Sequence, residues 1–384
     1  MSPAVVVVTG ALAGLLACLS TGQVPALAPR STPSPGAASG DEAPEVPPAL
    51  VDALARELEE WARVPGHRGV AASIVLADGA QWAGAAGWAA DGEPMRADHL
   101  VGIASITKTM TAAVILQLVD EGVVQLDDPL ERWLDPLPHV PPAITVRQLL
   151  NHTNGLDNYT ASAALGAALA ADPLHVFTPD ELLGFIGPPR FMPGERTEYT
   201  NTAFLLLGQL AERATGRSIV ELYRQRLWAP LGLEGVFMPG VDEPPAPVAA
   251  ALGRTGVVVD PLAQVGLLSI GQSAFGLFAD AATVARWGRA LFTGTVISAE
   301  RQEEMRTLVP AAGNIPGESG AGLGIRGYQY LERQQYGHSG GMSLGSSLLL
   351  FDPESGVTVA VAANQGANAG HFALAPALLA AAAP

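Results

Sequence analysis

Strand-like segments lie near both ends of this 384-residue chain, and a long block of helices and loops separates them. Near the N-terminus, apolar residues at helical spacing predict a helix over 49–63. Two apolar runs follow, 70–76 and 81–88, and Asp78-Gly79 between them is typical of a hairpin turn. The N-terminal part therefore predicts one helix followed by an antiparallel pair of strands.

The C-terminal part repeats this combination in the opposite order. We expect strands and then an Ala/Leu-rich helix there, at 322–325, 329–336, 344–351, 357–363 and about 371–383. Between the two ends, roughly 123–300, the sequence predicts loops and short helices, at 146–150, 179–186, 202–215, 219–227 and 281–292. Strands from both ends bury their apolar faces best in one sheet. The expected fold class is therefore α+β, an antiparallel sheet flanked by the N- and C-terminal helices, with an inserted all-helical lobe.

The first 48 residues do not have the pattern of a folded domain. Residues 1–22 are apolar but too short for a typical membrane span, and they predict a secretory signal. Cys18, in Leu-Leu-Ala-Cys, resembles a lipoprotein signal, so cleavage, lipid anchoring through Cys18 and an uncleaved anchor remain alternatives. Residues 23–48 are rich in Pro, Ala and Ser and predict a linker. We expect a folded domain over 49–384 in a secreted or cell-envelope protein.

Composition restricts the partners. The net charge of −16 argues against nucleic acid or an anionic membrane surface as a partner. One cysteine excludes an intrachain disulfide and a cysteine-built metal site, and the seven histidines show no ligand spacing. We expect a monomer without metal or cofactor that acts on a small substrate.

Lys108 is the only lysine among 21 basic Lys and Arg residues. A lysine retained against such a bias is expected where arginine cannot replace it, because a buried amine can lose its proton and arginine does not. A helix predicted over 104–121 and stopped by Gly122 places Ser105 at its start. Ser105 and Lys108 then lie one turn apart on one face, which is a geometry for an activated nucleophile.

Two further motifs follow along the chain, Tyr199-Thr200-Asn201 and His338-Ser339-Gly340-Gly341. Ser-x-x-Lys, Tyr-x-Asn and His-Ser-Gly in this order resemble the serine β-lactamase and penicillin-binding-protein superfamily. Further matching segments, 116–122, 144–153 and 322–325, are similar to secreted D-alanyl-D-alanine carboxypeptidases of actinomycetes and their class C β-lactamase and esterase relatives. The resemblance covers about residues 50–380 and implies the α/β sandwich of that superfamily.

The resemblance assigns roles to the first two motifs. Ser105 is the expected nucleophile, and Lys108, kept neutral by burial and nearby positive charge, is expected to take or relay its proton. Tyr199 is the expected second proton carrier, as base for acylation and acid to the leaving amine. Its phenol must then titrate far below its ordinary value or share a proton with Lys108. Asn201 is expected to hold Lys108 and to donate to a substrate amide. The N–H groups of Ser105 and Gly341 form the expected oxyanion hole, with Gly341 on an edge strand.

The third motif and one arginine are assigned to substrate binding. His338 stands where many relatives carry lysine; we expect it to hydrogen-bond Tyr199 and to lend partial positive charge. Ser339 and Arg326 match positions that bind a substrate carboxylate. His152, in a loop near the cleft, is expected to be structural.

The function that the resemblance implies is a D-alanyl-D-alanine carboxypeptidase that acts on peptidoglycan stem peptides and is acylated by penicillin. A carboxylesterase or a β-lactamase with the same acylating residues is the alternative. A catalytically silent binding module is a third reading, against which the presence of Ser105, Lys108 and Tyr199 argues.

Residues 337–341 also match the Gly-x-Ser-x-Gly elbow of α/β-hydrolases, with Asp352 and His371 in triad order. An elbow serine lies between a strand and a helix, whereas a hairpin is expected after Ser339. The sequence therefore favours Ser105 over Ser339 as the nucleophile.

Overall fold

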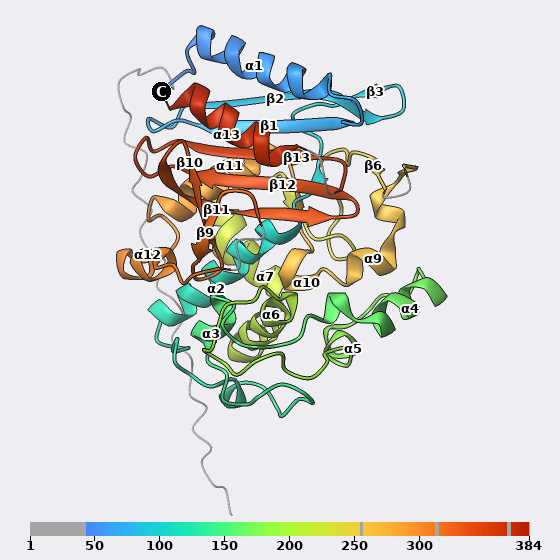
Figure 1. The fold of residues 1–384 in the computed structure, drawn as a ribbon, viewed down its shortest axis with the longest axis vertical. Coiled ribbons are helices and arrows are strands. Elements are labelled where there is room, and N and C mark those ends of the chain that lie inside the picture. The colour runs from blue at the N-terminus through green and yellow to red at the C-terminus, as the bar shows by residue number, and fades with distance from the viewer. Residues whose placement is uncertain (1–43, 254–255, 312–314, 367–369, 384) are drawn as a thin grey trace, which may run out of the picture. The chain divides into compact units, whose positions relative to one another are not determined.

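One eight-stranded antiparallel sheet combines the two ends of the chain (Figure 1). The computed structural model describes residues 44–253, 256–311, 315–366 and 370–383. In spatial order the strands are β3 (Glu93–Pro94), β2 (Gln81–Ala90), β1 (Gly69–Val75), β13 (Thr358–Ala363), β12 (Gly345–Phe351), β11 (Arg333–Met342), β10 (Arg326–Tyr330) and β9 (Glu318–Ala321). N-terminal β1 pairs with C-terminal β13, so the sheet predicted from both ends is confirmed.

Both faces of the sheet are covered by helices. On one face α1 (Pro48–Ala62) and α13 (His371–Ala382) pack against each other; in Figure 1, α1 lies at the top and α13 crosses in front of the upper strands. The other face carries α11 (Ala281–Phe292). Side chains of β12 alternate between the two apolar clusters: Leu348 packs with α1 and α13, and Leu349 packs on the α11 side. This period of two is what a sheet buried on both faces requires.

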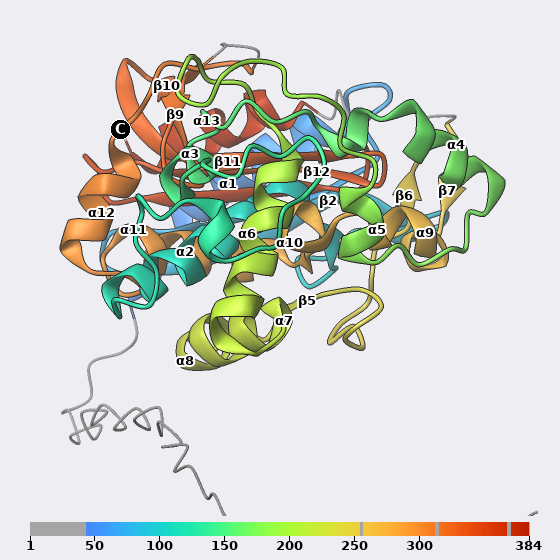
Figure 2. The same cartoon turned by 90° about the horizontal axis from the view of Figure 1, so that it is seen from below.

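The helical lobe surrounds α2 (Thr107–Asp120), whose residues are almost all buried. Helices α6 (Asn201–Thr215) and α10 (Gln272–Phe275) pack on it, as Figure 2 shows. The remaining helices are α3 (Val146–Leu150), α4 (Ala163–Ala171), α5 (Pro179–Leu183), α7 (Ile219–Tyr223), α8 (Ala229–Leu231), α9 (Val265–Ser269) and α12 (Ala299–Arg306). Two small sheets complete the fold, β4 (Val101–Gly102) with β8 (Phe278–Ala279) and β5 (Val236–Phe237), and β6 (Ala251–Leu252) with β7 (Val258–Val259).

Two predicted strands near the third motif are wrong. Residues 322–325 form a turn, and the strand there is β9, which ends at Ala321. Residues 329–336 are not one strand, because the chain reverses at Leu331 and Glu332 between β10 and β11. Both turn residues have positive φ, 53° and 60°, a conformation that side chains rarely adopt and that Gly or Asn usually signals.

The predicted signal over 1–22, Cys18 and nearly all of the linker over 23–48 lie outside the described residues. Within the described ranges, we find no helix that combines the length and the apolar character needed to cross a membrane.

Candidate active site

Ser105 lies in a short 3₁₀ turn, Ala104–Ile106, that leads directly into α2. Ala104 before it has φ 46°, a strained conformation for a residue with a side chain. Two contacts from the sheet hold this turn: Ser347 Oγ donates to the Ile103 carbonyl at 2.7 Å, and Gly340 of β11 packs directly on the same carbonyl. The strained turn is thereby fixed against the sheet.

Lys108 is fully buried one turn after Ser105. Its Nζ lies 2.7 Å from Asn201 Oδ1, 2.8 Å from the Ala274 carbonyl oxygen and 3.2 Å from Ser105 Oγ. Burial, and secondarily the charge of Arg326, lower the pKa of Lys108 well below its usual value. A neutral amine has two hydrogens and one lone pair. The amide and carbonyl oxygens accept the two hydrogens, which leaves the lone pair for the Ser105 hydroxyl.

Tyr199 lies against both residues. Its hydroxyl is 2.7 Å from Ser105 Oγ. The centre of its ring lies 4.8 Å from the Lys108 amine, 4.7 Å from the Arg326 guanidinium and 4.6 Å from the centre of the His152 ring. Burial raises the pKa of Tyr199, although Arg326 and the Ser105 hydrogen bond act in the opposite direction. Of the two expected alternatives for Tyr199, a phenol that titrates far below its ordinary value is contradicted, and a proton shared with Lys108 stays a prediction. Tyr199 keeps its proton and can donate it.

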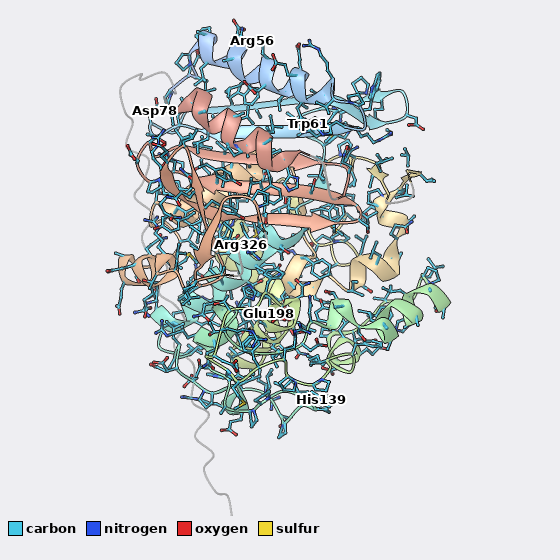
Figure 3. The ribbon with its side chains drawn as sticks, viewed as in Figure 1. Arg56, Trp61, Asp78, His139, Glu198 and Arg326 are labelled. Atoms are coloured by element: carbon cyan, nitrogen blue, oxygen red, sulfur yellow. The ribbon has the colours of Figure 1, made fainter. Side chains whose placement is uncertain are left out.

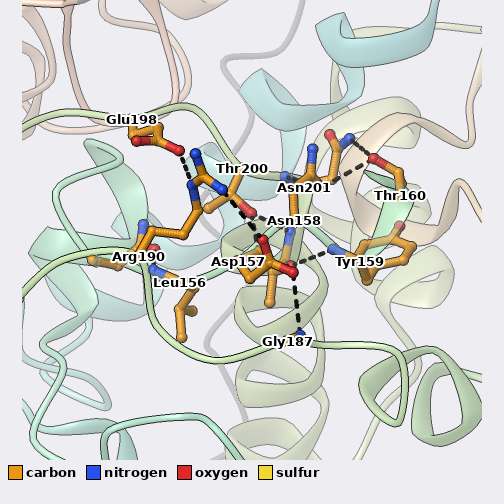
Figure 4. Close-up of polar contacts among 12 residues, drawn as sticks. Leu156, Asp157, Asn158, Tyr159, Thr160, Gly187, Arg190, Glu198, Thr200 and Asn201 are labelled. Carbon is orange, nitrogen blue, oxygen red and sulfur yellow. Dashed lines mark hydrogen bonds and ion pairs between the residues drawn. The ribbon is translucent and has the colours of Figure 1, made fainter. Parts of the chain in front are cut away.

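A loop of the helical lobe orients Asn201 (Figure 4). Asn201 Nδ2 donates to Thr160 Oγ1 at 3.0 Å, and the Asn201 backbone N–H donates to Asn158 Oδ1 at 3.2 Å. Because the Thr160 hydroxyl donates its own hydrogen to Asn158 Oδ1 at 3.0 Å, it accepts from Asn201 Nδ2, and Oδ1 of Asn201 faces Lys108 as an acceptor. Asn201 thus holds the amine as predicted, and the second Nδ2 hydrogen stays available for a substrate.

Strand β11 is an edge strand only over its second half. β10 pairs with it from Arg333 to Gly337, and residues 338–342 pair with β12 alone among the described strands. Gly341 lies in this open segment and is exposed. The open backbone edge, not the whole strand, is where a substrate strand can add.

The role expected of His338 needs correction. Its Nδ1 lies 2.6 Å from the carbonyl oxygen of Ser339, and its ring centre is 6.2 Å from that of Tyr199, without a hydrogen bond between them. Burial, followed by Arg326 and Lys108, lowers the pKa of His338 well below its usual value. A neutral His338 lends no positive charge; Arg326 is the positive group beside Tyr199. Ser339 lies within β11, not at a strand-to-helix turn, so the elbow reading is excluded.

Arg326 reaches the site as predicted, but its guanidinium is already paired. The Glu318 carboxylate forms an ion pair with its Nη1, and the side chains of Arg326 and Glu318 are only 8% and 2% exposed. The predicted binding of a substrate carboxylate by Arg326 stays a prediction, with an internal competitor that the sequence did not reveal.

A cavity of about 850 Å³ opens beside the nucleophile. Most of the predicted site residues line it: Ser105, Tyr199, Arg326, His338, Ser339 and Gly341. Lys108 and Asn201 are not among the lining residues and contact each other beside Ser105. His152, Glu198 and Glu318 also line the cavity. Within the described residues, no group of three or more His, Cys, Asp or Glu side chains could hold a metal.

Sequence reasoning missed two partners of these residues. The Ala274 carbonyl fixes Lys108 from 166 residues away, and a backbone oxygen carries no sequence signal. Glu318 lies in a segment without a motif. His152, expected to be structural, packs its ring on that of Tyr199, and its Nδ1 accepts from the Thr200 N–H at 3.4 Å.

The pKa of Lys108 predicts the pH dependence of acylation. We expect kcat/KM to be low at acid pH and to rise as the pH passes the lowered pKa of Lys108, because only the neutral amine accepts a proton. The rise of kcat/KM with pH should persist in His338→Asn, even if that variant is slower. A rise of kcat/KM centred at pH about 10.4, the ordinary pKa of lysine, would contradict a pKa lowered by burial.

Comparison with known proteins agrees with this geometry. Residues 51–383 match the beta-lactamase family. A D-aminopeptidase of Brucella anthropi is 38% identical over 144 residues, 37% of this chain and 26% of that protein. A D-alanyl-D-alanine-carboxypeptidase/endopeptidase of Escherichia coli K12 is 30% identical over 154 residues, 38% of this chain and 39% of that protein. The matches thus span only about a quarter to two fifths of the length of these curated relatives.

A solved structure extends the similarity over the folded part. The D-stereospecific amidohydrolase from Streptomyces sp. superposes with a TM-score of 0.72 and 32% identity, over 82% of this chain and 94% of that one. Fold, order of motifs and family match agree over the same residues. The chain belongs to the beta-lactamase family of serine hydrolases.

Proposed function

We propose that this protein hydrolyses the amide bond on the carbonyl side of a D-amino acid residue, through an acyl-Ser105 intermediate. The observation that carries the proposal is the set of partners around Lys108. Two acceptors occupy its hydrogens, so the lone pair of the neutral amine is left for the Ser105 hydroxyl at 3.2 Å. Acyl transfer needs a base whose lone pair is held in a fixed orientation toward the nucleophile.

In the proposed acylation, Ser105 Oγ attacks the substrate carbonyl carbon while its proton moves to Lys108 Nζ. The carbonyl oxygen becomes negative, and the N–H groups of Ser105 and Gly341 are the proposed donors to it. Substrate backbone would add along residues 338–342, where one edge of β11 is not paired with any described strand. The lysine is then an ammonium held by Asn201 and Ala274.

The bond to the leaving amine breaks when that nitrogen receives a proton. Tyr199, which keeps its proton and lies 2.7 Å from Ser105 Oγ, is the proposed donor, and the proton on Lys108 replaces the one it loses. The acyl-enzyme is hydrolysed in reverse: water gives a proton to this pair, its oxygen attacks the acyl carbon, and Ser105 recovers its hydrogen.

The D configuration is supported by the names of the relatives, which are a D-aminopeptidase, a D-alanyl-D-alanine-carboxypeptidase/endopeptidase and a D-stereospecific amidohydrolase. Cleavage of D-alanyl-D-alanine in a peptidoglycan stem peptide is the case in which the residues on both sides of the bond are D-Ala. It would require export of the protein, which the predicted N-terminal signal would provide. Ester and β-lactam substrates would use the same acylation step.

Labelling and stereospecificity test the proposal together. We expect benzylpenicillin to add one covalent adduct at Ser105 in the intact protein, and none in Ser105→Ala, by mass spectrometry. We also expect D-alanine p-nitroanilide to be cleaved at least about tenfold faster than its L isomer, a difference of about 1.4 kcal/mol in activation free energy. Equal rates for the two isomers would overturn the D specificity, and an unlabelled, folded wild type would overturn the acyl-enzyme.

A further inference from the structure

We infer that Glu318 determines which leaving groups the protein accepts: it occupies the guanidinium of Arg326 and so disfavours a leaving group that carries a free carboxylate. The inference rests on the proposed function and narrows its substrate class. Peptides and amides whose leaving group is uncharged would be preferred to peptides that end in a free D-alanine. Glu318 is thus a specificity-determining residue.

The ion pair is built into the cavity wall. Glu318 begins β9 and Arg326 begins β10, two antiparallel neighbours whose register shifts between Gly327 and Tyr328. Their side chains are 2% and 8% exposed, and both residues line the cavity that contains Ser105. Arg326 lies at the border between the sheet and the helical lobe in Figure 3. A pair so deeply buried does not exchange freely with solvent ions, because separating it leaves two uncompensated charges.

Arg326 lies beside Tyr199, the proposed proton donor to the leaving group. Its guanidinium is 4.7 Å from the Tyr199 ring, and the Tyr199 hydroxyl is the group proposed to protonate the leaving nitrogen. A carboxylate one residue beyond that nitrogen would extend toward Arg326. There it would find the guanidinium bound to Glu318, and it would lie beside a second negative charge.

No other group described in the cavity wall offers a compensating charge. The third charged residue that lines it is Glu198, which is acidic and pairs with Arg190 and Arg196 outside the lining. The pKa values of His152 and His338 are lowered well below their usual value, so both rings are neutral. Glu318 compensates Arg326, and Arg190 and Arg196 compensate Glu198, so a substrate carboxylate meets no unpaired positive charge at the described cavity wall. A neutral amide needs no such partner.

A pair of substrates tests this directly. Diacetyl-Lys-D-Ala-D-Ala and the same peptide with a C-terminal amide differ only in the terminal carboxylate. We expect wild-type protein to cleave the amide-terminated peptide at least about tenfold faster in kcat/KM. In Glu318→Gln, which keeps the size of the side chain and frees Arg326, the ratio of acid to amide should rise by at least about tenfold.

Glu198→Gln is the matched control. It removes one negative charge from the same cavity but leaves the Glu318–Arg326 pair intact, so the ratio should change by less than about threefold. Because each ratio is measured on one preparation, partial unfolding of a variant affects both substrates equally. The double variant Glu318→Gln/Arg326→Gln should lose the gain seen in Glu318→Gln alone.

The outcomes separate the two proposals. If wild-type protein cleaves neither peptide nor D-alanine p-nitroanilide, the proposed function fails. If it cleaves the amide-terminated peptide but Glu318→Gln leaves the ratio unchanged, the role of Glu318 is wrong and the hydrolase stands. A wild type that prefers the free acid also overturns the inference. The carboxylate would then bind elsewhere in the cavity, for instance beside the buried Ser346 hydroxyl that lines it.

Discussion

Lys108→Arg is expected to lower the rate of Ser105 acylation by at least about a thousandfold, as the loss of a positioned general base does. A guanidinium keeps its proton near neutral pH and therefore offers no lone pair to the Ser105 hydroxyl. It also forces a charge into a site that disfavours one, because burial and Arg326 both lower the pKa of Lys108. Adduct formation with benzylpenicillin, followed by mass spectrometry against time, measures this loss.

Lys108→Met separates lost chemistry from lost folding. It should abolish acylation equally, yet its thermal midpoint should match or exceed that of the wild type. The sign follows from linkage: the folded state binds the Lys108 proton more weakly than the unfolded state does, so the lysine destabilises the folded state, and this destabilisation grows as the pH falls below the ordinary pKa of lysine. A thioether of similar length has no such cost. Near wild-type acylation in either variant would contradict the role of Lys108 as the base.

The fold was predictable where local signals and global packing agree. Asp78-Gly79 marks the first hairpin and Gly122 the end of α2, and Gly79 and Gly122 have φ of 97° and 71°, which favour glycine. The hairpin between β10 and β11 was missed because Leu331 and Glu332 adopt positive φ without a turn residue. There the pairing of the flanking strands overrides local preference, which a single sequence does not reveal.

The residues of the site were predictable from the sequence, but the protonation states of their side chains were not all predictable. Ser105, Lys108, Tyr199 and Asn201 meet as their motifs predict, at distances of 2.7 to 3.2 Å along the Tyr199–Ser105–Lys108–Asn201 chain. Their protonation depends on burial and on Arg326, contributed by a distant strand. The sequence therefore predicted the lowered pKa of Lys108, where burial was assumed, but not the raised pKa of Tyr199 or the strongly lowered pKa of His338.

Gly340→Ala should disable the site by displacing the part of β11 that lies against the turn carrying Ser105. A β-carbon there would lie well inside van der Waals contact with the Ile103 carbonyl oxygen and Ser347 Oγ, and backbone cannot move aside cheaply. The added methyl would push β11 away from the strained turn that carries Ser105. We expect a loss of about 1–3 kcal/mol in unfolding free energy, as overpacking causes, and slower acylation of the protein that remains folded.

Gly341→Ala, one residue along the same strand, is the matched control for stability. A β-carbon on Gly341 would meet no atom within 4 Å, and neither glycine has a positive φ, so the two variants differ in available space and not in backbone strain. Chemical denaturation should therefore leave Gly341→Ala within about 0.5 kcal/mol of the wild type, as for a substitution on an open surface. Equal stability of the two variants would mean that β11 does not hold the Ser105 turn. In that case the turn would keep its strained shape through α2 and the Ser347 hydrogen bond alone, and the closeness of Gly340 would have no consequence for catalysis.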